Sequence, residues 1–156
     1  MKRAMDLNWS EINFFKAEEW PSGTLPHMSA RLIYVLDEIR AKLPKGHTMQ
    51  PSGLAEAHVR HTHGNSRHET KGGTRLSDAT DVFMQWNTVW AAWLEAQRHP
   101  EVGGLGIYFD SITGRPFMHI DLRPERMLWV RHEGKYTYFH HNPIAFFKVL
   151  AEHGRS

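Results

Sequence analysis

The chain has 156 residues, carries a formal net charge of +2 and contains no cysteine. This length suits one domain with a hydrophobic core, and the absence of cysteine excludes disulfides and thiolate metal sites. The small net charge gives no reason to expect nucleic acid, and no apolar run approaches the about 20 residues that cross a bilayer. We therefore expect a single domain over residues 1–156, a monomer, with no nucleic-acid or membrane partner.

The N-terminal part is predicted to combine a hook, one long helix and a polar loop. A hook or short helix extends to about Trp20, with aromatic residues as anchors. Apolar residues at helical spacing predict an amphipathic helix over residues 28–43. Residues 46–80 are rich in Gly, His, Ser and Thr, and a loop this long in a compact domain is commonly functional.

A strand and a second helix are predicted next. Residues 79–84 have the pattern of a short strand. Residues 88–99 follow as a helix with Asn87 as its cap, and we expect its inward stripe to be Trp90, Ala91 and Leu94.

The remaining chain is predicted to be mostly strands, followed by one helix. Two pairs of strand-like runs are separated by turn signals, and the second pair folds as a hairpin about Glu133-Gly134. The expected strands cover residues 105–109, 116–122, 127–131 and 136–139. Asn142 and Pro143 have the residue types of a helix start, and the apolar face of that helix is expected to be Ile144, Phe147, Val149 and Leu150. The predicted fold class is α+β, with a small, mostly antiparallel central sheet and flanking helices.

One strand carries residues that are suited to chemistry. Because side chains alternate along a strand, Phe117, His119 and Asp121 share one face, and the intervening apolar residues belong to the core. An imidazole and a carboxylate side by side can ligate a metal, orient a ligand or transfer protons. An exposed polar face without function is the alternative for this segment alone.

Two further residues complete a possible metal site. His68 lies in the polar loop and Asp81 lies near a strand start, so neither has the position of a core residue. With His119 they form a two-histidine, one-carboxylate set, which is typical of a catalytic zinc with one open position.

These residues resemble the motifs of the M15-type zinc D-Ala-D-Ala peptidases. The shared pattern is Ser66-x-His68, then Ala79-x-Asp81, then Phe117-x-His119-x-Asp121 after a glycine-rich strand. The resemblance covers residues 30–131 and implies the Hedgehog/D-Ala-D-Ala peptidase-like fold. Members are cell-wall carboxypeptidases, murein endopeptidases and phage endolysins. The resemblance implies a zinc cofactor held by His68, Asp81 and His119, with Ser66 contacting substrate.

The chain departs from this pattern around the first ligand. The spacing from His68 to Asp81 is thirteen residues instead of the usual seven, with residues 69–74 inserted, which leaves His61 or His63 as alternatives to His68. The arginine that grips a substrate carboxylate is expected to be Arg60 or Arg75.

The general base of the family is also replaced. Many members carry an acid three residues before the last histidine, where this chain has Pro116. Asp121 is the expected catalytic base. The alternatives are a role of Asp121 in orienting His119, and Glu69 as a weaker candidate for the base.

We expect a zinc metallopeptidase that hydrolyses peptide bonds of bacterial peptidoglycan, as a phage or prophage endolysin. The alternative is a non-catalytic phage structural or binding module with the same fold. Residues 1–15 lack the apolar segment of a signal peptide, so we expect synthesis in the cytoplasm and action at the cell wall after release or within a virion.

Overall fold

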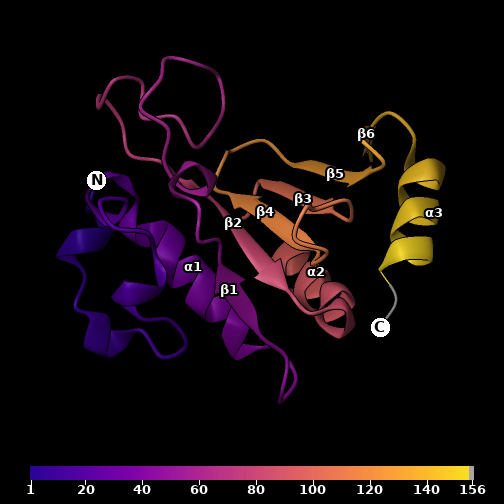
Figure 1. Ribbon diagram of the computed structural model, residues 1–156, viewed down its shortest axis with the longest axis horizontal. Helices are drawn as coiled ribbons and strands as arrows, with labels where there is room; N and C mark the ends of the chain where they lie inside the picture. Colours follow the sequence, from indigo (N-terminus) through magenta and orange to yellow (C-terminus); the bar gives the residue numbers. More distant parts are fainter. Residues whose placement is uncertain (155–156) are drawn as a thin grey trace.

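Six strands form one sheet in the order β1-β2-β4-β3-β5-β6 (Figure 1). The computed structural model describes residues 1–154. The strands are β1 (Met49–Pro51), β2 (Ala79–Met84), β3 (Gly104–Tyr108), β4 (Phe117–Asp121), β5 (Met127–His132) and β6 (Lys135–Tyr138). The helices are α1 (Ala30–Ala41), α2 (Val89–Arg98) and α3 (Pro143–His153). This architecture confirms the expected α+β class.

Strand pairing is antiparallel throughout the sheet except between β3 and β5, which run parallel. The prediction of a mostly antiparallel sheet is therefore confirmed. The hairpin of β5 and β6 turns at Glu133 and Gly134, whose φ angles of 50° and 72° suit the two-residue turn that matches strand twist.

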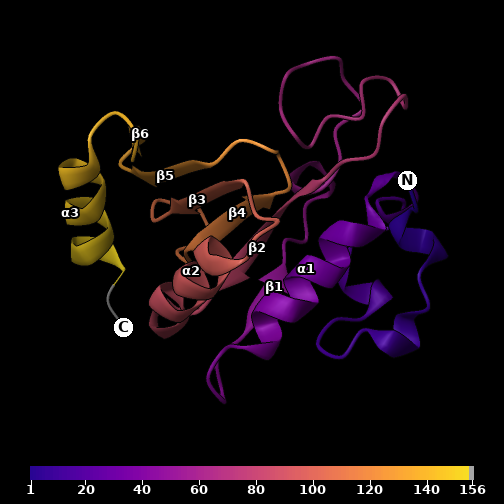
Figure 2. The same ribbon diagram turned by 180° about the vertical axis from the view of Figure 1, so that it is seen from behind.

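The two faces of the sheet have different roles. Helices α1 and α2 lie on the same side of the sheet, and α3 lies beside β5 and β6 (Figures 1 and 2). Alternate strand residues on the covered face are fully or almost fully buried and form the core with α1 and α2. They include Val82, Leu105, Ile107, Met118, Ile120 and Val130. The opposite face is consequently available for a site.

The N-terminal half differs from the predictions in three places. The N-terminal segment forms short 3₁₀ turns (Ala4–Asp6, Trp9–Glu11, Ala17–Glu19 and Leu25–His27) in place of one helix. Strand β1 was not predicted, because three residues are too few to show the alternation of apolar and polar residues that indicates a strand. Asn87 is not the cap of α2, because it lies within a 3₁₀ turn, Trp86–Thr88, that leads directly into the helix.

The residues that the two later helices bury match the expected stripes only in part, and Leu150 is the confirmed member. In α2 the buried residues are Val89, Ala92, Trp93 and Ala96, while Trp90 and Leu94 are only partly buried against the core. In α3 the buried residues are Phe146 and Leu150. Ile144 and Phe147 are 83% and 47% exposed, because α3 meets the rest of the protein along one narrow side. The predicted cap is confirmed, since the Asn142 side chain accepts a hydrogen bond from the Ala145 amide.

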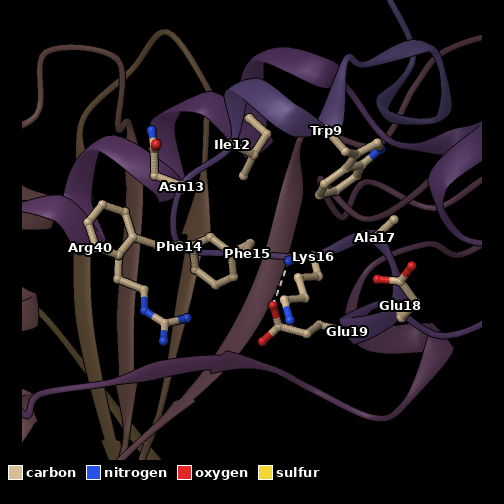
Figure 3. Close-up of a pocket in the computed structure, with 10 residues that line it drawn as sticks. All are labelled: Trp9, Ile12, Asn13, Phe14, Phe15, Lys16, Ala17, Glu18, Glu19 and Arg40. Atoms are coloured by element: carbon tan, nitrogen blue, oxygen red, sulfur yellow. Dashed lines mark hydrogen bonds between the residues drawn. The ribbon is translucent and has the colours of Figure 1, made fainter.

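Among the described residues, no helix combines the length and apolar character needed to cross a membrane. A hollow of about 820 Å³ lies in the N-terminal segment, between aromatic residues and Arg40 (Figure 3). The chain beside it is attached to α1, because the buried Asp37 carboxylate accepts hydrogen bonds from the Asn13 and Phe14 amides. No histidine lines this hollow, so the chemistry suggested by the sequence lies elsewhere.

Candidate metal centre

Strand register brings two of the three expected ligands together. Asp81 on β2 is the direct partner of His119 on β4, so their side chains emerge next to each other on the open face of the sheet. Nδ1 of His119 lies 3.0 Å from Oδ1 of Asp81. His68, from the loop before β2, places its Nε2 3.1 Å from Nδ1 of His119 and 3.6 Å from Oδ1 of Asp81.

The dimensions of this triad fit a zinc ion. Ligands about 2.0 to 2.1 Å from a tetrahedral ion lie about 3.3 Å from one another. The three donor atoms are 3.0, 3.1 and 3.6 Å apart, which is one face of such a tetrahedron. Two imidazole nitrogens with one carboxylate oxygen are also a donor set that zinc prefers. The residues present therefore fit the metal that the sequence suggests.

The loop that carries His68, residues 58–78, is fixed by hydrogen bonds and is here called the ligand loop. The His68 carbonyl accepts from the Arg60 amide, and the Thr70 amide donates to the Arg60 carbonyl, both at 2.8 Å. The amide of His68 donates to Oγ of Ser66 at 3.4 Å. His68 is only 3% exposed.

Arg75 stabilises the ligand loop from within. Its guanidinium donates to the carbonyls of Glu69 at 2.7 Å, Ser66 at 3.0 Å and Arg67 at 3.3 Å. These carbonyls flank His68 on both sides. The inserted residues 69–74 thus form a turn that brings Arg75 next to His68 and its neighbours in the ligand loop. The structure does not place Arg75 on the metal cleft described below, because its side chain is engaged by backbone.

Asp121 lies behind His119 and has no solvent exposure. Its Oδ2 lies 2.8 Å from Nε2 of His119, and its Oδ1 accepts from the Gly104 amide at 3.0 Å. Arg123 donates to both oxygens through Nε, at 2.8 and 3.0 Å. A carboxylate at Nε2 makes that nitrogen the donor of a neutral imidazole, which leaves the lone pair of Nδ1 for a metal. This geometry favours the orienting role that was the alternative for Asp121.

Two glycines on β3 make room for this arrangement. A Cβ at Gly104 would lie 2.2 Å from Oδ2 of Asp121, and a Cβ at Gly106 would lie 2.1 Å from the ring of Trp129. That ring packs against the His119 imidazole, with centroids 5.2 Å apart. The glycine-rich sequence before the last ligand therefore has a steric reason.

The charges of His119 and of the two carboxylates beside it stabilise one another. Burial alone would lower the pKa of His119, but its hydrogen bonds to Asp121 and Asp81 outweigh burial and raise that pKa to about 9. Burial would raise the pKa of both carboxyls, but the hydrogen bonds from His119 hold them well below the usual range. The pKa of His68 is lowered by burial. Without a metal, His119 is therefore a cation between two carboxylates.

The triad opens into a hollow of about 390 Å³, here called the metal cleft. Of the residues expected to bind substrate, Ser66 and Arg60 line it. Several lining residues were not predicted from the sequence, namely Arg67, Tyr108, Arg123, Trp129, Arg131 and Tyr136. His61 and His63, the alternatives to His68, are exposed and are not part of the triad.

Comparison of the chain with protein-family models, with curated proteins and with solved structures finds no match.

Proposed function

We propose that this protein is a zinc-dependent peptidase that cleaves peptide bonds of bacterial peptidoglycan. The observation that carries the proposal is the convergence of His68, Asp81 and His119, whose donor atoms lie 3.0 to 3.6 Å apart at the wall of a cleft. The resemblance of these three motifs to M15-type peptidases supports peptidoglycan as the substrate and the Hedgehog/D-Ala-D-Ala peptidase-like fold as the type.

In the proposed peptidase, the ligands would hold zinc, Asp121 would orient a ligand, and Tyr108 would donate a hydrogen bond in the cleft. When bound, zinc lowers the pKa of a water ligand to about 7 and polarises a carbonyl group. Asp121 holds the His119 ring in the orientation and tautomer that suit a ligand. Tyr108 accepts a hydrogen bond from Nε1 of Trp129 at 3.2 Å, and burial raises its pKa, so its neutral hydroxyl can donate into the cleft.

A metal-dependent binding module is the second candidate function. Asp81 is the one carboxylate among the residues that line the metal cleft, and it is itself a ligand. A peptidase commonly needs a further group to move the proton of the attacking water. A phage structural or binding module with the same metal site has no such need.

The first test is the metal content of the purified protein, measured by inductively coupled plasma mass spectrometry. We expect about one zinc per chain in the wild type, loss of zinc in His119→Ala, and retention in His61→Ala. His61 is a matched control because it lies in the ligand loop and outside the triad. Absence of zinc from the wild type after incubation with zinc would overturn the proposal.

The second test separates the two candidate functions. Purified peptidoglycan is incubated with the zinc-loaded protein, and released fragments are identified by mass spectrometry. New peptide termini that vanish with chelator and in His119→Ala support the peptidase. Zinc-dependent binding to peptidoglycan without new termini supports the binding module instead.

A further inference from the structure

A row of large side chains crosses the open face of the sheet beside the metal ligands. Cross-strand partners connect Phe83 to Phe117, Phe117 to Tyr108, Tyr108 to Arg131 and Arg131 to Tyr136. This set of five residues is here called the aromatic row. On β2 and β4, Phe83 and Phe117 are two residues along the strand from Asp81 and His119. The aromatic row therefore lies directly beside the Asp81–His119 pair on the same face of the sheet. A ligand at the metal would therefore lie beside the aromatic row.

Arg131 is the one cation in this row, and aromatic rings fix its position. Its guanidinium carbon lies 5.9 Å from the ring centre of Tyr108 and 5.4 Å from that of Tyr136. Its Nε is buried and makes no hydrogen bond within residues 1–154. Arg131 forms an ion pair with Asp110, whose Oδ2 lies 3.4 Å from this Nε and also accepts from the Gly134 amide at 2.7 Å.

The other arginines of the metal cleft are engaged differently. Arg67 forms a two-point ion pair with Asp78, and Arg123 forms one with Asp121. Arg60 is exposed at the rim and donates to the carbonyl of Glu56. Arg131 donates no side-chain hydrogen bond within residues 1–154, so the terminal nitrogens of its guanidinium remain for a ligand, and a guanidinium fork matches the two oxygens of a carboxylate.

Arg131 also borders a second hollow that adjoins the metal cleft. This hollow, of about 250 Å³, shares Asp81, Phe117 and Arg131 with the metal cleft. Four of its remaining lining residues are apolar (Leu54, Ala57, Phe83 and Ile112), and four are polar (Ser52, Asp110, Ser111 and Thr113). A chain that crosses the metal centre would thus meet a cation and a partly apolar pocket together.

The distance between Arg131 and the metal ligands determines where along a substrate a carboxylate bound by Arg131 would lie. Arg131 is two strands from His119 and one row along, which corresponds to about 12 Å between Cα atoms. An extended peptide covers this distance in about three residues. Resting on the function proposed above, we propose that Arg131 determines specificity by binding a substrate carboxylate within about three residues of the bond held at the metal, with an apolar side group in the second hollow.

The test measures binding without relying on cleavage. The probe is the stem peptide L-Ala–γ-D-Glu–L-Lys–D-Ala, compared with the same peptide in which both carboxylates are amides. Chelator-treated full-length protein is titrated with each peptide to millimolar concentration, and binding is followed by ¹H–¹⁵N NMR. We expect the wild type to bind the acid form about tenfold or more tightly than the amide form.

Arg131→Gln is expected to bind both peptides equally, at the affinity of the wild type for the amide. Arg98→Gln removes the same charge from an exposed helix position and is expected to keep the wild-type preference. Arg131→Lys keeps the charge without the planar fork, and we expect an intermediate preference; it also replaces Arg131→Gln if that variant does not fold.

An unchanged preference in Arg131→Gln, or no binding of either peptide to the wild type, would overturn the inference. Zinc content and release of peptide termini from peptidoglycan are measured separately. Failure of the peptidase function is thereby distinguished from failure of the role of Arg131.

Discussion

The Asp121 carboxylate and the His119 imidazole form a buried pair, 2.8 Å apart, on the side of the ring that faces away from Asp81. Through this pair, hydrogen bonds run from the Gly104 amide to Asp121, then to His119 and on to Asp81. It decides which ring nitrogen carries hydrogen and which one faces the triad.

Asp121→Asn is expected to weaken zinc binding about 10- to 100-fold, because the ring loses its orienting carboxylate. Competition with a chromophoric chelator measures the affinity. Asp6→Asn, at an exposed residue paired with Arg3, is the control and should bind zinc as the wild type does. Undiminished zinc affinity together with lost hydrolysis would instead favour the catalytic-base role for Asp121.

Zinc binding should release about one proton per chain at pH 7. The pKa of His119 is about 9 in the metal-free protein, so the ion must displace a proton from this ring. Below pH 9 the apparent affinity should therefore rise about tenfold per pH unit, and it should level off above. Calorimetry in buffers of different ionisation enthalpy counts the proton; a count near zero at pH 7 would contradict the raised pKa.

Arg75→Lys is expected to lower zinc affinity about tenfold while the protein stays folded. A lysine ammonium cannot reproduce the planar fork that contacts the Ser66, Arg67 and Glu69 carbonyls, so His68 loses part of its support. Chelator competition gives the affinity, and circular dichroism checks the fold. Arg98→Lys controls for the change of residue type, and equal zinc affinity in the two variants would show that Arg75 does not position His68.

Gly106→Ala is expected to destabilise the protein by about 1 to 3 kcal/mol, because the added methyl group collides with the Trp129 ring. Urea unfolding followed by tryptophan fluorescence measures the change. Gly53→Ala is the matched control, since a Cβ there meets no atom within 4 Å. Equal free energies of unfolding in the two variants would show that the Trp129 ring can move aside without loss of stability.

Much of the local structure could be predicted because its signals are local. Alternation of apolar residues predicted β2 at Ala79–Met84, and the Glu133-Gly134 pair predicted the hairpin turn. The three candidate ligands could be selected from their residue types, from their positions near strands and in the polar loop, and from their resemblance to the peptidase motifs.

The arrangement around the triad could not be predicted from the sequence, because it depends on strand order. Strand β3 pairs with β4 on one side and with β5 on the other, and no local pattern encodes this choice. The contact of Trp129 with His119 and the aromatic row follow from that order. The role of Arg75 was missed for a related reason, since its acceptors are backbone carbonyls, which have no signature in residue type.

The alternation along β4 has a consequence for how this protein can diverge. Phe117 and His119 line the metal cleft and Asp121 lies behind His119, while Met118 and Ile120 between them are fully buried in the core. Substitutions of the first set change what is bound, and substitutions of the second set change whether the chain folds. The two faces of one strand can therefore diverge separately, the cleft face in ligand preference and the core face in stability.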